Sequence, residues 1–187
     1  MLGIALGVAA LIIVLSVMNG FQREVRDRML SVISHVEVSD AGGAALADWR
    51  RTASEARRNP QVIGAAPFVA AQALIGRGDE MRGAIVRGIS PNDEATVTDL
   101  AAQLKDTTLK RLVPGEWNIV LGVELARSLG VRTGDKVTVV VPGGQVTPAG
   151  IVPRLKTLTV VGTFDAGHYE YDSGLALAHL DLSLIHI

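Results

Sequence analysis

The sequence contains no cysteine, few aromatic residues and no clear excess of either charge. Without cysteine, the 187-residue chain can form no disulfide and no thiolate metal site. Aromatic residues make up only 4% of the chain, so its core must be built from Val, Leu, Ile and Ala. The formal net charge of −1 gives no sign of the basic surface that nucleic-acid binding usually requires. We therefore expect an aliphatic core in one or two domains and no nucleic-acid partner.

Sequence signatures of the common active sites are also missing. The chain has no Gly-rich phosphate loop ending in Gly-Lys-Ser/Thr, no His-Glu-x-x-His zinc motif and no Gly-x-Ser-x-Gly nucleophile motif. One group of polar residues has a spacing that metal ligands can show, although residues alternating along a turn give the same pattern. It consists of Asp165, His168, Glu170 and Asp172. The other histidines, His35, His179 and His186, lie far from it in the sequence. We expect no catalytic, cofactor or metal site.

A long apolar segment opens the chain. Residues 2–18 contain Ser16 as their only polar side chain, and no charge appears before Arg23. As a helix, the first 18 residues would extend roughly 27 Å, close to the ~30 Å hydrocarbon core of a bilayer. A cleaved signal peptide is the alternative, but the basic start and small-residue cleavage site of such peptides are missing. We predict a transmembrane helix over residues 1–20 that is truncated at its N-terminus.

The next segment has the pattern of an amphipathic helix. Phe21, Val25 and Met29 recur at helical spacing with charges between them, which predicts a stalk helix over residues 21–34. Only Asn19 and Gly20 separate it from the membrane segment, so the two form one long helix with a possible bend at this point.

Residues 35–187 are expected to form an α+β domain that is truncated at its C-terminus. Alternating or continuous apolar runs predict strands at 35–38, 67–76, 81–89, 118–122, 135–141, 155–164 and 173–180. Helical patterns predict helices at 44–58, 98–104 and 122–131. Strands with interspersed helices favour α+β over a doubly wound sheet.

A long loop is predicted between two of these strands, at residues 142–154. It is too long for an ordinary hairpin turn and is rich in proline and glycine. It is not a phosphate cradle, because prolines lack the N–H donors and a strand, not a helix, follows. Prolines also reduce the ordering cost of binding. The loop is therefore either a stiff, apolar protein-binding element or a tolerated surface insertion.

Four stretches of the chain resemble one known family. They are LGVAALIIVLSVMNGFQREVRDRML, NIVLGVELARSLGVRTGDKVTVVVPGG, TPAGIVPRLKTLTVVGTF and YEYDSGLALAHL. Together they resemble the lipoprotein-releasing ABC transporter permeases, the LolC and LolE family, whose periplasmic domain is of the MacB type. The SVMNGF and TPAG segments carry most of the specificity. The resemblance covers essentially the whole chain and favours a LolC-like role.

The resemblance implies a fragment of an inner-membrane permease whose main domain lies in the periplasm. Such permeases have four transmembrane helices, with the periplasmic domain between the first and the second. ATP and Mg²⁺ would be bound by a separate LolD-like ATPase subunit, so this chain is expected to hold no cofactor and to be no enzyme. Its other implied partners are a second permease subunit (LolE-like or an identical copy), a LolA-like periplasmic carrier, the lipoprotein substrate and membrane lipid.

The resemblance also implies two sets of functional residues. A protruding β-hairpin, the hook, captures the carrier in LolC, and Pro148, Ala149 and Gly150 fall at its tip. The full hook is expected to comprise Pro142, Gly143, Gly144, Gln145, Val146, Thr147, Pro148, Ala149, Gly150, Ile151, Val152, Pro153 and Arg154. Coupling of the membrane helix to the stalk is expected at Met18, Asn19, Gly20 and Phe21.

Two other classes of protein stay open on the sequence alone. A MacB-like exporter permease or a cell-division permease would share the fold and differ in substrate. A membrane-anchored sensor with an extracytoplasmic ligand domain would share only the anchor and would need a signalling module elsewhere in its chain.

Overall fold

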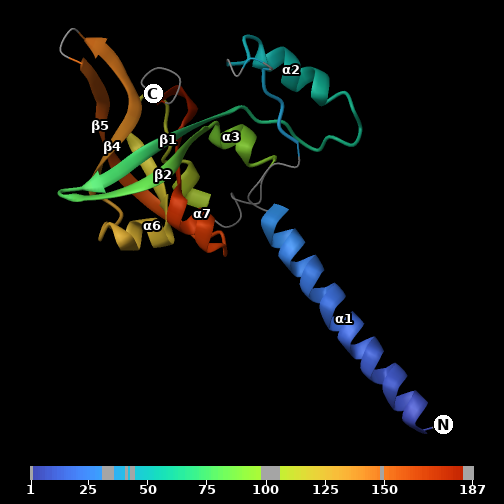
Figure 1. Ribbon diagram of the computed structural model, residues 1–187. Coiled ribbons are helices and arrows are strands. Elements are labelled where there is room, and N and C mark those ends of the chain that lie inside the picture. The colour runs from blue at the N-terminus through green and yellow to red at the C-terminus, as the bar shows by residue number, and fades with distance from the viewer. Residues whose placement is uncertain are drawn as a thin grey trace. The chain divides into compact units, whose positions relative to one another are not determined.

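The computed structural model describes residues 2–30, 36–40, 42, 45–97, 106–147 and 150–182. The chain separates into two compact units, Met1–Glu37 and Val38–Ile187. A single long helix makes up most of the first unit, and the described strands all belong to the second (Figure 1).

Helix α1 (Leu2–Leu30) carries the apolar segment. The 21 residues from Gly3 to Arg23, with a mean hydropathy of 2.4, are long and apolar enough to cross a membrane. The helix continues through Asn19 and Gly20, so the predicted membrane helix and stalk are one element as far as Leu30. These two residues each cost at most about 1 kcal/mol relative to Ala, which strong helix formers on both sides offset. Residues 31–34 of the predicted stalk lie outside the described residues.

Helix α2 (Trp49–Ala56) is shorter than the predicted helix at 44–58. Its N-cap is Asp48, whose side chain accepts a hydrogen bond from the Arg51 N–H at 3.1 Å, an arrangement that fixes a helix start. Its inner face buries Ala53. The prediction of a strand at 35–38 is wrong for residues 36–38, which form neither helix nor strand. Within the described part of the chain, no strand pairs with them.

Six strands of the described part form a closed barrel. They are β1 (Phe68–Arg77), β2 (Glu80–Ile89), β3 (Asn118–Gly122), β4 (Lys136–Thr147), β5 (Gly150–Phe164) and β6 (Leu175–His179). The order around the barrel is β1-β2-β6-β3-β5-β4. Strand pairs β2/β6 and β3/β5 are parallel, and the other pairs are antiparallel. The α+β class is therefore confirmed, with the strands closed into a mixed barrel.

The barrel interior is aliphatic, as the shortage of aromatic residues predicts. Its most deeply buried members include Ile75, Val86, Ile119, Leu121, Val139 and Val160, each at most 3% exposed. Side chains alternate between the two faces of a strand, so the inward positions of all six strands contribute to one cluster. Burying such side chains is the main source of stability, at about 1.5–3 kcal/mol for each one.

Within the described residues, four short helices connect the strands: α3 (Pro91–Glu94), α5 (Asp106–Leu109), α6 (Val123–Ser128) and α7 (Tyr169–Gly174). The predicted helix at 122–131 corresponds to α6, and Gly130 follows it at a φ of +61°, which favours glycine. The strand predicted at 173–180 is largely confirmed by β6, although α7 takes its first two residues. The helix predicted at 98–104 lies outside the described residues.

Candidate functional site

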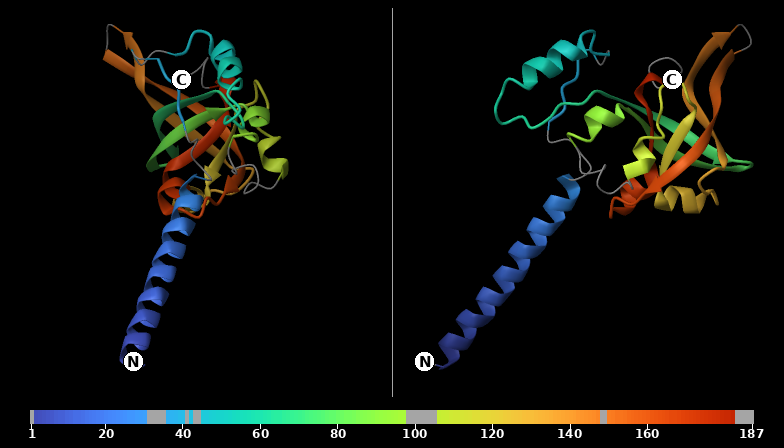
Figure 2. Two further views of the ribbon diagram at one scale, coloured as in Figure 1. Left: turned by 90° about the vertical axis from the view of Figure 1, so that its right-hand side faces the viewer. Right: turned by 180° about the vertical axis from the view of Figure 1, so that it is seen from behind.

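Strands β4 and β5 continue as a hairpin through the segment that was predicted as a loop. Beyond the pair Val141 and Arg154, Gln145 pairs with Val152 and Thr147 pairs with Gly150. Figures 1 and 2 show this hairpin extending beyond the other barrel strands. The loop prediction for 142–154 was therefore wrong for the described backbone, which is a β-ladder, whereas the predicted hairpin form is present. Pro148 and Ala149, at the predicted tip, lie outside the described residues.

An irregularity divides this hairpin from the barrel. Between the Val141–Arg154 and Gln145–Val152 pairs, the β4 side has Pro142, Gly143 and Gly144 where the β5 side has only Pro153. Proline cannot donate a hydrogen bond to a ladder, and so it is tolerated at bulges. Bulges also bend a strand and increase its twist. The proline and glycine content thus produces a bent hairpin base rather than an unstructured loop.

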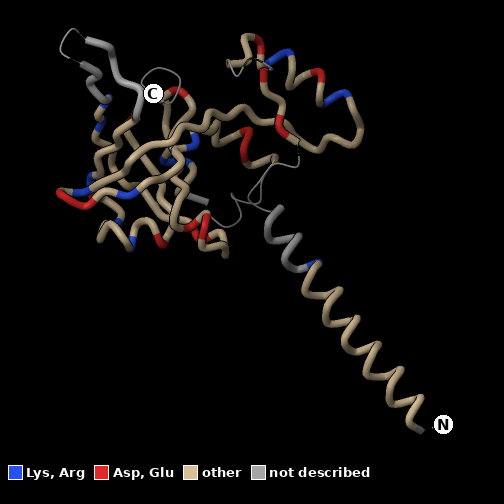
Figure 3. Tube along the Cα trace, in the orientation of Figure 1, with Lys and Arg blue, Asp and Glu red and all other residues tan. Residues whose placement is uncertain are grey.

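Helix α1 is the second candidate element. Figure 3 shows that it carries no charge from its start to Arg23. Its large apolar side chains are exposed within the chain, including Ile4 at 70% and Phe21 at 67%. Such a surface is stable only against lipid or another apolar partner. The predicted coupling residues Met18, Asn19, Gly20 and Phe21 all lie within this uninterrupted helix.

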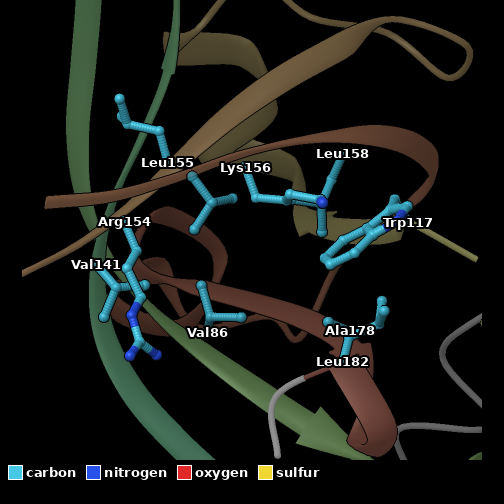
Figure 4. Close-up of a pocket in the computed structure, with 10 residues that line it drawn as sticks. Val86, Trp117, Val141, Arg154, Leu155, Lys156, Leu158, Ala178 and Leu182 are labelled. Atoms are coloured by element: carbon cyan, nitrogen blue, oxygen red, sulfur yellow. The ribbon is translucent and has the colours of Figure 1, made fainter. Parts of the chain in front are cut away.

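A pocket opens at the base of the hairpin, with a volume of about 280 Å³ (Figure 4). Val141 and Arg154, the last regularly paired residues before the bulge, both line it. Apart from Lys156, the other lining residues are largely apolar: Val86, Trp117, Val139, Leu155, Leu158, Ala178 and Leu182. The pocket is therefore an apolar hollow that is continuous with the inside of the barrel and lies directly beside the hairpin.

The rim of this pocket is cationic. Arg154 and Lys156 are both exposed, and none of the lining residues is acidic. The Lys156 ammonium lies 3.7 Å from the centre of the Trp117 ring, a cation–π contact that fixes the position of the charge. Between the two cations, Leu155 is 61% exposed. The hairpin base therefore presents an apolar hollow, an exposed leucine and two positive charges, which suits a protein partner with apolar and acidic groups.

This pocket was not predicted from the sequence. Trp117 is an isolated aromatic residue about 40 positions from Lys156 in the chain, and only the parallel pairing of β3 with β5 brings the two together. The available signal was a tryptophan just before a buried strand in a chain with two tryptophans.

The polar residues around His168 do not form a metal site. Among the described residues, no group of three or more His, Asp or Glu side chains could hold a metal ion. Asp172 is buried and accepts a hydrogen bond from the Ala166 N–H at 2.7 Å, while Asp165 and Glu170 are exposed. Burial raises the pKa of Asp172 above its ordinary value of 3.8, and the negative charge of Asp165 adds to that rise. Asp172 thus holds the turn before α7 in place.

Comparison with known proteins supports one family. Residues 1–182 match the family described as MacB-like periplasmic core domain. The chain is 47% identical over 178 residues to the lipoprotein-releasing system transmembrane protein LolC of Neisseria meningitidis serogroup B, covering 95% of this chain and 43% of that protein. It is 47% identical over 180 residues to LolC of Xylella fastidiosa, covering 96% of this chain and 43% of that protein. Identity to LolE of Haemophilus influenzae is 34% over 143 residues, covering 75% of this chain and 34% of that protein. The chain spans less than half the length of these relatives, and the resemblance seen in the sequence is confirmed.

Proposed function

The chain belongs to the MacB-like periplasmic core domain family, and from that premise we propose that it is part of a lipoprotein-releasing ABC permease. The permease would extract outer-membrane-directed lipoproteins from the inner membrane and hand them to a periplasmic carrier. The observation that carries this proposal is the combination of a membrane-length apolar helix with a barrel whose hairpin stands clear of it, in a chain 47% identical to LolC proteins.

In this proposal the chain supplies movement and binding, not chemistry. A LolD-like ATPase subunit would bind ATP and Mg²⁺ in the cytoplasm, and a second permease, LolE-like or an identical copy, would complete the membrane part. Helix α1 would lie in the inner membrane and the barrel in the periplasm. Substrate acyl chains would pass against the apolar face of α1, and Met18, Asn19, Gly20 and Phe21 would transmit motion out of the membrane.

We assign carrier capture to the hairpin of residues 142–154. Its backbone is held by the β4–β5 ladder, so little ordering entropy is lost when a partner binds. The pocket at its base offers a place for an apolar side chain of the carrier. Arg154 and Lys156 would attract acidic groups beside it. A partner bound by the hairpin would therefore also contact the pocket.

The assignment is tested by crosslinking in the full-length permease, assembled with its partner subunits. Photoreactive residues would replace Val146, Ile151 and Arg154 one at a time, with Lys110 and Thr133, exposed residues outside the hairpin, as control sites. We expect LolA-like carrier to be captured from the hairpin and not from the controls. If all three hairpin sites fail while a control site captures the carrier, the hairpin is not the docking element.

A further inference from the structure

The connection between α2 and the barrel contains no helix or strand of its own. Residues 57–61 form turns, and residues 62–67 run irregularly into β1. A connection of this kind is normally a flexible part of a domain. Here the short helix α3 lies against it, as the views in Figures 1 and 2 agree. Two consecutive carboxylates of α3 have partners on different elements, Asp93 on the α2 side and Glu94 on the barrel side.

The barrel side of α3 is held by a buried ion pair. The Glu94 carboxylate is 1% exposed and lies 3.4 Å from a guanidinium nitrogen of Arg87 on β2, whose side chain is 14% exposed. The same guanidinium lies 4.4 Å from the centre of the Phe68 ring at the start of β1. A buried charge that loses its partner is strongly disfavoured. Helix α3 therefore stays attached to the barrel.

The α2 side of α3 is held by weaker, exposed contacts. A guanidinium nitrogen of Arg57 lies 3.8 Å from the Asp93 carboxylate and donates a hydrogen bond to the Ala65 carbonyl at 2.6 Å. Asp93 is itself oriented by the Ser90 hydroxyl, which donates to its other carboxylate oxygen at 2.7 Å. Both charged side chains are more than a third exposed, so solvent screens this pair. Contacts of this strength can break and re-form.

The backbone of the connection at Gly64 also lies close to the turn that follows α3, at Thr96. A Cβ atom built on Gly64 would lie 2.5 Å from the Thr96 carbonyl oxygen and 2.8 Å from its hydroxyl oxygen. Only glycine leaves room for that approach. The Thr96 hydroxyl in turn donates to the Asp93 carbonyl at 2.7 Å, so this contact leads back to the same turn of α3.

We propose that α3 is a latch that fixes the α2 segment to the hairpin-bearing barrel. Arg87 and Glu94 anchor the latch permanently, and Arg57, Asp93 and the Gly64–Thr96 contact form its releasable face. When the latch is closed, residues 57–67 and the barrel move as one body. The latch rests on the proposed function in one respect: in a transporter it would carry movement from the α2 segment to the hairpin.

The mechanical part is tested without transport. Spin labels would be placed at Glu55 on α2 and Thr133 on the barrel of the full-length protein, since both residues are exposed. The described chain contains no cysteine that would compete for the label. We expect a narrow distance distribution in the parent protein and in Arg57→Lys, which keeps a cation and a donor. Arg57→Glu, which repels Asp93, should broaden the distribution at least twofold.

Arg58→Glu is the matched control, because it makes the same charge change one residue away on an exposed side chain for which the described residues give no side-chain partner. It should leave the distribution narrow. An unchanged distribution in Arg57→Glu, or equal broadening in Arg58→Glu, overturns the latch.

The transport part is measured with the assembled permease, as ATP-dependent release of a radiolabelled lipoprotein to the carrier. Arg57→Glu should reduce release at least threefold while the carrier crosslink at the hairpin persists, and Arg57→Lys should restore release. A broadened distance distribution with undiminished release overturns the coupling role. If the parent protein releases no lipoprotein, the proposed function fails, and the distance measurement still decides whether the latch exists.

Discussion

Two regions of the domain each place a cation over an aromatic ring: the hairpin base, and the junction where α3 contacts the barrel. The charges around the two cations differ. At the junction, Arg87 lies over Phe68 and is paired with the buried Glu94. At the hairpin base, Lys156 lies over Trp117 and faces a pocket with no acidic lining residue. In the first arrangement the cation has a buried counter-charge from the same chain, and in the second the cation is exposed beside a pocket with no acidic lining residue. This difference motivates our two proposals, that the α3 contact holds the domain together and that the hairpin base binds a partner.

The largest effect is expected from removing the charge of Glu94. Glu94→Gln leaves the Arg87 guanidinium buried without its counter-charge, which costs about 3–5 kcal/mol. The melting temperature of the full-length protein should fall by roughly 6–20 °C, as measured by thermal unfolding in detergent.

Two comparisons make the Glu94 result specific. Glu80→Gln changes an exposed residue beside the β1–β2 turn, and its melting temperature should equal that of the parent protein. The double variant Arg87→Met with Glu94→Leu should melt above Glu94→Gln, because apolar residues of similar size can replace a buried pair. If Glu94→Gln melts with the parent protein, the junction is not closed by this pair.

A smaller effect, on binding alone, is expected at the hairpin base. Lys156→Glu reverses the charge at the pocket rim and should weaken capture of the carrier by about tenfold, equivalent to ~1.4 kcal/mol. Because Lys156 is exposed, loss of its cation–π contact with Trp117 should lower stability by no more than about 1 kcal/mol. Both are checked on the full-length protein, by carrier binding at low ionic strength and by thermal unfolding.

Lys110→Glu provides the control for Lys156→Glu, since it makes the same change on an exposed residue outside the pocket. Equal loss of carrier binding in the two variants would mean that overall charge matters and the pocket rim does not.

The smallest effect concerns Asp172, a buried carboxylate that forms no ion pair with any basic side chain of the described residues. Burial raises its pKa above the ordinary 3.8, so the folded state binds this proton more tightly than the unfolded state. Its contribution to stability therefore falls as the pH rises from about 4 through the raised pKa. Asp172→Asn keeps the acceptor for the Ala166 N–H and should remove that part of the pH dependence, measured as melting temperature against pH. Asp79→Asn, in the exposed β1–β2 turn, should leave the profile unchanged.

The parts of the fold that follow from local pattern could be predicted from the sequence. The apolar run of α1, the alternation in β1 and β2 and the buried run of β3 each determine an element without reference to distant residues. The hairpin was wrongly predicted as a loop because proline and glycine, which occur mostly in loops, make up Pro142, Gly143, Gly144 and Pro153. Its ladder depends on pairing that starts in the barrel and continues past the bulge.

The charged sites could not be predicted from local sequence pattern either. Nothing in the spacing of Arg87 and Glu94 distinguishes a buried pair from two exposed charges, because their burial depends on the packing of Phe68 and α3. The hollow at the hairpin base depends on the parallel pairing of β3 with β5, which brings Trp117 beside Lys156. Long-range packing of this kind leaves no periodic signal in the sequence.

The most direct measurement of the central claim is lipoprotein transfer by the reconstituted full-length permease after residues 142–153 are replaced by Asn-Gly. This two-residue turn can close the hairpin between the directly paired Val141 and Arg154, so the barrel should keep its melting temperature. We predict that ATP hydrolysis by the complex persists while transfer of lipoprotein to the carrier falls at least tenfold. Transfer at the parent rate by a complex carrying the shortened hairpin would contradict the account.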